Sequence, residues 1–137
     1  MPHNARVKPE VIRMADGIRE AGGYRWVGIY AVGPEEISVI GWSGPAPPTH
    51  PRFPKDRGLC GAAAASGKTI VVEDVTKDPR YLKTLDTTRS EMVVPVKREN
   101  GEVVGLIDVE SDHEDAFTPL DLRLLEGYAS AVARLWR

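Results

Sequence analysis

The chain has very little cysteine, with Cys60 as the single one in 137 residues. One cysteine cannot form an internal disulfide framework, so we expect a reducing compartment and a cytoplasmic location. The net charge is −2 and the basic residues form no stripe, so the electrostatic signature of a nucleic-acid-binding protein is missing. Apolar runs are shorter than a membrane span, and residues 1–5 lack a secretory-signal pattern. We therefore expect neither nucleic acid nor a membrane among the partners.

Motifs that hold common cofactors are also missing. The sequence has no phosphate-binding loop, no dinucleotide fingerprint and no paired ligands at zinc spacing, so we expect no cofactor and no metal site. The composition that is present, 42% hydrophobic and 28% charged, is that of a globular protein. A chain of this length suits one domain with a real core. We assign a single domain to residues 1–137, with its core at about residues 9–136.

The pattern of apolar residues predicts the order of helices and strands. Helical spacing and stop signals predict helices over residues 9–21, 58–66 and 118–136. Runs of β-branched and aromatic residues predict strands over residues 25–32, 36–42, 69–73, 92–97 and 103–109. The prolines and polar residues predict a surface loop over residues 43–56 and a loop with one helical turn over residues 74–89.

Short connections between neighbouring strands determine the predicted fold class. Asn100-Gly101 lies between two β-branched runs and predicts a tight hairpin. Thr118 followed by Pro119 and Asp121 predicts the start of the last helix. Together these signals predict an α+β fold, a central antiparallel sheet flanked by helices, which we place on one side of the sheet.

Strand periodicity brings several polar and aromatic residues onto shared faces. Trp26 and Tyr30 share one face of their strand, Asp108 and Glu110 share one face of theirs, and Glu91 lies at the start of the neighbouring strand. If these faces converge, they form a pocket with aromatic walls and three carboxylates, which favours a ligand bearing an ammonium group. The alternative is that the aromatics are ordinary core residues and the acids are solvated strand ends, the commoner arrangement. Against that alternative, two acids at this spacing repel each other without a cation or shared proton.

Cys60 lies at the start of the predicted helix over residues 58–66. The partial positive charge of a helix N-terminus would lower the pKa of the thiol and favour the reactive thiolate. The alternative is a small, buried and inert side chain, the commoner fate of a lone cysteine. Among the three histidines, His3, His50 and His113, only His50 is placed to approach Cys60.

Five segments together carry a resemblance to a known family. They are residues 26–30 (WVGIY), 57–62 (RGLCGA), 73–75 (EDV), 90–95 (SEMVVP) and 104–111 (VGLIDVES). With these segments in this order, residues 26–136 resemble the GAF superfamily, and more narrowly the stand-alone GAF proteins that reduce free methionine (R)-sulfoxide. The resemblance implies that Trp26, Tyr30, Glu91, Asp108 and Glu110 line a substrate pocket. The family usually has aspartate at the position of Glu110.

The same resemblance argues against the family's catalytic mechanism. Those reductases attack the sulfoxide with a cysteine thiolate, and a second cysteine resolves the product as a disulfide. The position of the nucleophile matches Thr84 here, and another family cysteine matches His50. Only Cys60 remains, so the resemblance implies a reductase scaffold without its catalytic cysteine.

These observations lead to one predicted function and two alternatives. The prediction is a GAF domain that binds or senses a small, amine-bearing metabolite and passes the signal to a separate partner or through a dimer. The resemblance implies a homodimer formed by the terminal helices. One alternative is a reductase that uses Cys60 as its catalytic residue with an external thiol, and the other is a dimeric interaction module without a ligand. Whether residues 43–56 form a mobile lid stays open at this point.

Overall fold

A computed structural model describes residues 9–136 of the chain. Residues 1–5, on which the signal-sequence expectation rests, and His3 lie outside this range. The helices are α1 Pro9–Gly22, α2 Gly58–Ser66 and α3 Pro119–Val132, with 3₁₀ turns at η1 Val75–Lys77 and η2 Ala133–Trp136. The strands are β1 Trp26–Val32, β2 Glu36–Ser43, β3 Arg52–Pro54, β4 Ile70–Val72, β5 Ser90–Lys97 and β6 Val103–Ser111.

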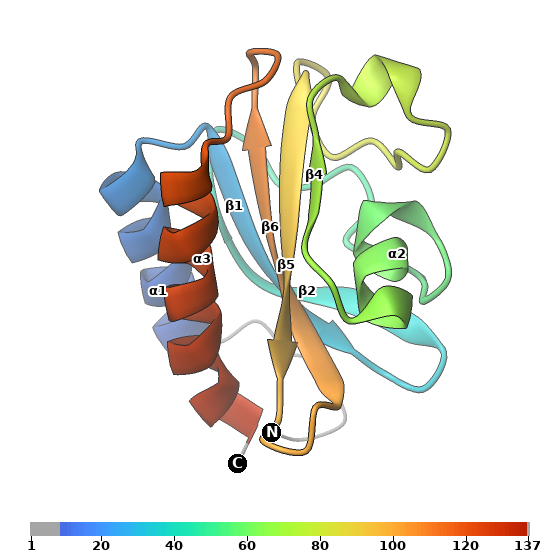
Figure 1. Cartoon of the computed structure of the whole chain (residues 1–137), viewed down its shortest axis with the longest axis vertical. Helices are drawn as coiled ribbons and strands as arrows, with labels where there is room; N and C mark the ends of the chain where they lie inside the picture. The colour runs from blue at the N-terminus through green and yellow to red at the C-terminus, as the bar shows by residue number, and fades with distance from the viewer. Residues whose placement is uncertain (1–8, 137) are drawn as a thin grey trace.

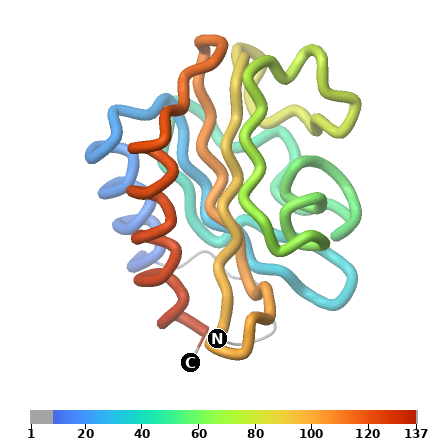
Figure 2. Tube along the Cα trace, viewed as in Figure 1, coloured from blue at the N-terminus to red at the C-terminus, as the bar shows by residue number. Residues whose placement is uncertain are grey.

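The strands form one six-stranded sheet in the order β3-β2-β1-β6-β5-β4. Every neighbouring pair is antiparallel. This confirms the predicted α+β class with a central antiparallel sheet. The chain trace in Figure 2 shows that β1 and β6, from opposite ends of the sequence, lie side by side in the middle of the sheet. Residues distant in sequence therefore meet on these two strands.

The helices cover both faces of the sheet, so the placement of all helices on one side is wrong. Helices α1 and α3 lie on one face and α2 lies on the other (Figure 1). The physical reason is that the central strands are apolar on both sides: Val27 and Ile29 belong to the core beneath α1 and α3. Trp26 and Tyr30, which alternate with them, belong to a second core beneath α2. The second core is the one that holds the candidate site.

Several helix ends lie where local sequence signals predict them. Helix α2 matches residues 58–66, and Gly67 ends it in the left-handed conformation at φ 68°. Thr118 caps α3, and its side chain and that of Asp121 form the reciprocal capping box. Strand β3 was not predicted, because the prolines of residues 43–56 indicate a loop. It is a three-residue strand at the sheet edge, where proline is tolerated.

Among the described residues 9–136, each helix is too short or too polar to cross a membrane.

Candidate functional site

Three carboxyl side chains meet on the face of the sheet that α2 covers. In strand register, Glu110 on β6 lies between Trp26 on β1 and Glu91 on β5. Two residues earlier on β6, Asp108 lies between Gly28 and Val93. Directly paired residues of an antiparallel sheet point to the same face. The structure thus brings together the aromatic and acidic residues that the sequence places on shared faces.

These acids are buried rather than solvated strand ends. Glu91 is 3% exposed, Asp108 1% and Glu110 0%. Glu91 Oε1, Asp108 Oδ1 and both Glu110 carboxylate oxygens have no hydrogen-bond partner within residues 9–136. A buried polar atom without a partner costs roughly 1–3 kcal/mol, and more when it is charged. The cluster is therefore costly for folding, which is the mark of a site kept for a ligand or a proton.

Burial and mutual repulsion both act on the protonation of the cluster. Burial is the largest cause that raises the pKa of Glu91, Asp108 and Glu110 above their ordinary values. The second cause is a neighbouring carboxylate: Glu110 acts on Glu91, Glu91 on Asp108, and Asp108 on Glu110. Such groups release their protons as a coupled set. A cationic ligand would relieve both the repulsion and the missing hydrogen bonds.

A small cavity opens beside this cluster. Its lining includes Tyr30, His50, Cys60, Thr84, Glu91 and Asp108. About 10 Å³ of it can hold the centre of a water molecule, which is room for about one water. Phe53 packs against the Tyr30 ring with centroids 5.8 Å apart. The cavity is closed in this conformation, so anything larger than an ion needs its walls to separate.

Cys60 faces the carboxylates, but its environment is the opposite of a reactive one. The side chain is 5% exposed, and its Sγ lies within 4.8 Å of carboxylate oxygens of Glu91 and Asp108. Burial, followed by the charges of Asp108, Glu91 and Glu110, raises the pKa of the thiol well above its ordinary value. The prediction that the helix N-terminus lowers this pKa is wrong, because desolvation and three acids outweigh the helix dipole.

Trp26 supports the loop beside the site and does not line the cavity. Its Nε1 donates a hydrogen bond to the Ala46 carbonyl at 2.9 Å, so the indole fastens residues 43–56 to the sheet. Thr49 connects residues 43–56 to a second loop: its backbone N–H and its hydroxyl donate hydrogen bonds to the Thr84 carbonyl at 3.0 and 2.9 Å. Residues 43–56 are thereby joined to residues 74–89 at the mouth of the cavity.

Glycine at position 28 makes room for the Trp26 ring. A Cβ at Gly28 would lie 2.3 Å from Trp26 Cη2 and 2.9 Å from Tyr30 Cε1. Gly28→Ala is therefore expected to destabilise the fold by about 1–3 kcal/mol through overpacking, as measured by urea unfolding. The control is Gly17→Ala in α1, where a Cβ has no neighbour within 4 Å and helix propensity gains about 0.5–1 kcal/mol. Equal stability of the two variants would contradict this packing.

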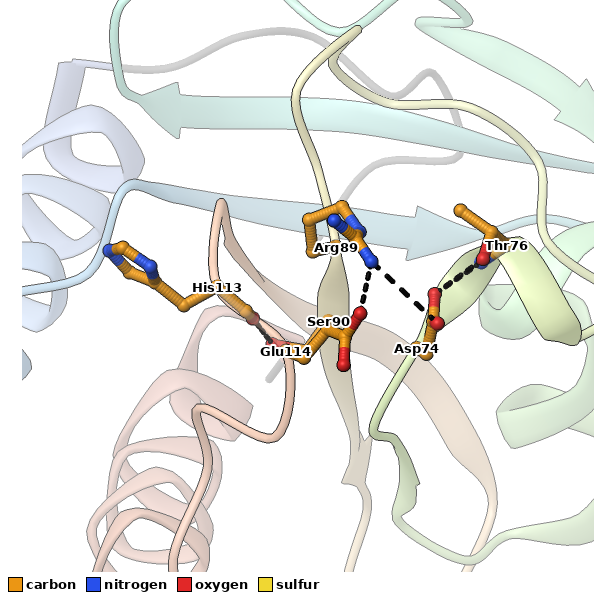
Figure 3. Close-up of polar contacts among 6 residues, drawn as sticks. All are labelled: Asp74, Thr76, Arg89, Ser90, His113 and Glu114. Atoms are coloured by element: carbon orange, nitrogen blue, oxygen red, sulfur yellow. Dashed lines mark hydrogen bonds and ion pairs between the residues drawn. The ribbon is translucent and has the colours of Figure 1, made fainter.

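A polar network fixes the strand ends next to the cluster (Figure 3). Arg89 pairs with Asp74, 3.8 Å away, and with Glu114. Ser90 donates a hydrogen bond to the His113 carbonyl at 2.6 Å. These contacts join the segment after β4, the start of β5 and the segment after β6. They position the residue that follows Ser90 in the chain, Glu91.

The structure adds residues to the site that the sequence did not single out. Thr49, Ala46, Phe53 and Arg89 close, support or position it. Each acts through a contact distant in sequence, and a single sequence carries no signal for such contacts. Conversely, Trp26 and Glu110 lie on the same face as the cavity but are not among the residues that line it.

Comparisons with known proteins agree with this architecture. The GAF domain family matches residues 11–135. GAF domain-containing protein A of Dictyostelium discoideum is 35% identical over 119 residues, which cover 86% of this chain and 71% of that protein.

Two solved structures are similar over most of their length. The type II free methionine-R-sulfoxide reductase from Thermoplasma acidophilum superposes with a TM-score of 0.86 at 30% identity, over 92% of this chain and 89% of that one. The free methionine-R-sulfoxide reductase from Neisseria meningitidis, in complex with its substrate, gives a TM-score of 0.82 at 33% identity, over 90% of this chain and 74% of that one.

Proposed function

This chain belongs to the GAF domain family, and we propose that its acidic cavity binds a small metabolite that carries an ammonium group. The observation that carries the proposal is the set of four buried carboxylate oxygens without hydrogen-bond partners in the described part of the chain. An ammonium group supplies three N–H donors and a positive charge. In the cavity it could donate to Glu91 Oε1 and Asp108 Oδ1, and its charge would offset the repulsion within the cluster.

The lining of the cavity supports a ligand of amino-acid size with a polar and an apolar end. Glu91 and Asp108 offer the anionic end, and Tyr30 offers an aromatic wall that can also contact a cation through its ring face. The similar Neisseria structure is that of a free methionine-R-sulfoxide reductase in complex with its substrate, which supports ligands of this class for the present chain. Free methionine and its sulfoxides are therefore the first compounds to test.

Ligand access requires the mouth to open. The closed cavity has room for about one water, and the bonds from Thr49 to the Thr84 carbonyl hold its two sides together. Loops that close over sites in this way open on microsecond-to-millisecond timescales in many proteins. Residues 43–56 act as the lid in this proposal, and Trp26 anchors its first part through Ala46.

A panel of ligands tests the proposal through thermal stability. A ligand at 100 times its dissociation constant stabilises a fold by about 2.7 kcal/mol. We expect a shift from one or more free amino acids or amines, with both methionine sulfoxide epimers and cyclic nucleotides in the panel. The matched control is the N-acetylated form of the same compound, which lacks the ammonium charge. Equal shifts from the free and acetylated forms, or no shift with any amine, would contradict the proposal.

Sulfoxide reduction is the second candidate function. The observation in its favour is Cys60, which lies beside the carboxylates in the cavity. Against it stand the raised pKa of that thiol and a threonine, Thr84, at the position that the family resemblance assigns to the nucleophile. We therefore place binding ahead of turnover.

A further inference from the structure

We propose that Cys60, Glu91 and Asp108 form a binding site for one divalent cation of the Zn²⁺ class. This inference goes beyond the proposed function, because the occupant is an ion rather than a metabolite. Because Glu91 and Asp108 serve both, the ion and an ammonium ligand would exclude each other.

The three donor groups come from different elements and converge on one point. Cys60 lies on α2, Glu91 on β5 and Asp108 on β6. One Sγ and one oxygen from each carboxylate all lie within 4.8 Å of one another. Tetrahedral zinc with Zn–S near 2.3 Å and Zn–O near 2.0 Å needs donors about 3.3–3.5 Å apart. Binding would therefore draw the three donor atoms from their present separations of up to 4.8 Å to that spacing.

The hydrogen bonding of these acids independently points to a cationic occupant. Glu91 Oε1 and Asp108 Oδ1 have no hydrogen-bond partner within the described range, and both side chains are at least nine-tenths buried. Both also line the cavity that Cys60 lines. Buried carboxylates in proteins are paired, hydrogen-bonded or coordinated to a metal. No positively charged side chain within residues 9–136 pairs with these two oxygens, so either a proton shared between the carboxyl groups or a bound cation satisfies them. The Cys60 thiol beside them favours the cation.

The size of the cavity suits an ion without any movement of the lid. It holds about one water, and a metal ion occupies similar space. A metabolite, in contrast, requires the lid to separate from residues 74–89. The conformation described here can therefore accept an ion, whereas a metabolite requires the lid to open first.

The donor set selects the class of metal. A thiolate with two carboxylates suits Zn²⁺, Co²⁺ or Cd²⁺, whereas Mg²⁺ and Ca²⁺ prefer six or more oxygen ligands. On binding, the S–H bond of Cys60 breaks, its proton goes to solvent and a sulfur–metal bond forms. The three protein donors leave the fourth position of the ion to a solvent ligand.

Cobalt titration of the full chain tests the site without any metabolite present. After treatment with chelator, we expect one Co²⁺ per chain and a sulfur-to-metal charge-transfer band in the near ultraviolet. Cys60→Ser should abolish the band, and Asp108→Asn should weaken the affinity by at least about 100-fold, because loss of a direct ligand costs no less than the loss of a residue that only supports one. The control is Asp115→Asn, an exposed acid of a separate surface groove, which should bind as the wild type does.

Protection of the thiol provides a second readout that needs no variant. Zn²⁺ is expected to slow alkylation of Cys60 at least tenfold, and Mg²⁺ is expected to leave the rate unchanged. A wild type without the charge-transfer band, or one whose thiol reacts equally fast with and without Zn²⁺, would overturn the assignment. Unchanged affinity in Cys60→Ser would do the same, because it places the ion elsewhere. The thermal screen with amines is carried out in the presence of a chelator. The amine proposal and the metal proposal can therefore fail independently of each other.

Discussion

Glu110→Gln is expected to make the protein more stable at neutral and alkaline pH. Both Glu110 oxygens are buried without hydrogen-bond partners in the part of the chain that the structure describes, and burial followed by the Asp108 charge raises the pKa of Glu110. A glutamine of the same shape carries no charge, and its amide can donate to the neighbouring carboxylates. Replacement of buried ionic groups by uncharged residues of similar volume stabilises many proteins by up to about 4 kcal/mol, which corresponds to several degrees in melting temperature.

The pH dependence of this gain follows from the sign of the pKa shift. Because the folded-state pKa values of the cluster are raised, the folded protein keeps protons that the unfolded chain releases above about pH 4. Stability from the cluster is therefore lost as the pH rises from about 4 through the folded-state values. The advantage of Glu110→Gln should grow between pH 5 and pH 8.

Calorimetric melting at both pH values measures this effect. The matched control is Glu36→Gln, an exposed glutamate on β2 of the same sheet, whose melting temperature should stay within about one degree of wild type, because an isolated surface change has a small effect. If Glu110→Gln melts at or below the wild-type temperature at pH 8, the cluster is not destabilising in the way its burial implies.

Thr84→Cys is expected to raise the methionine-(R)-sulfoxide reductase activity of the protein above that of the wild type. Thr84 and Cys60 line the same cavity, and the backbone of Thr84 makes its hydrogen bonds to Thr49 and Tyr81. The substitution therefore adds a thiol without removing one of these contacts. The introduced thiol takes the sulfoxide oxygen as a sulfenic acid and releases the thioether, and Cys60 then forms a disulfide with loss of water.

Turnover with a dithiol reductant measures this gain. We expect a rate about 100-fold above wild type, the low end of what one positioned catalytic group contributes in acid–base catalysis. Thr84→Ser controls for the change in size, and the double variant with Cys60→Ser should form the sulfenic acid but turn over more slowly. An inactive Thr84→Cys that still binds the sulfoxide would show that a missing nucleophile is not what limits this scaffold.

The sequence predicts the parts of this fold that local signals control. The capping box at Thr118 and the helix stop at Gly67 are local, and both are confirmed. Strand alternation also predicts that Asp108 and Glu110 share one face, whereas the arrival of Glu91 on that face depends on the pairing of β5 with β6. Strand β3 was missed because proline signals outweigh a three-residue edge pairing, which depends on β2.

The sequence did not predict which helices and loops cover each face of the sheet. The burial of Glu91, Asp108 and Glu110 depends on α2 and on the loops that close over the second core. The pKa of the Cys60 thiol is raised by burial and by acids on β5 and β6. The helix N-terminus, the only influence visible in the sequence, predicted a lowered pKa instead. The lid contact between Thr49 and Thr84 likewise joins two segments that carry no shared pattern.

The most direct test of the ammonium-binding cavity is calorimetric titration of the best amine from the thermal panel into wild type, Glu91→Gln and Glu36→Gln. Loss of one partner of a buried charged contact costs about 2 kcal/mol or more, a factor of about 30 in the dissociation constant. The account predicts one ligand per chain, affinity weakened by at least that factor in Glu91→Gln, and wild-type affinity in Glu36→Gln. Equal affinities in all three proteins would contradict it, because the ligand would then bind without the buried carboxylates.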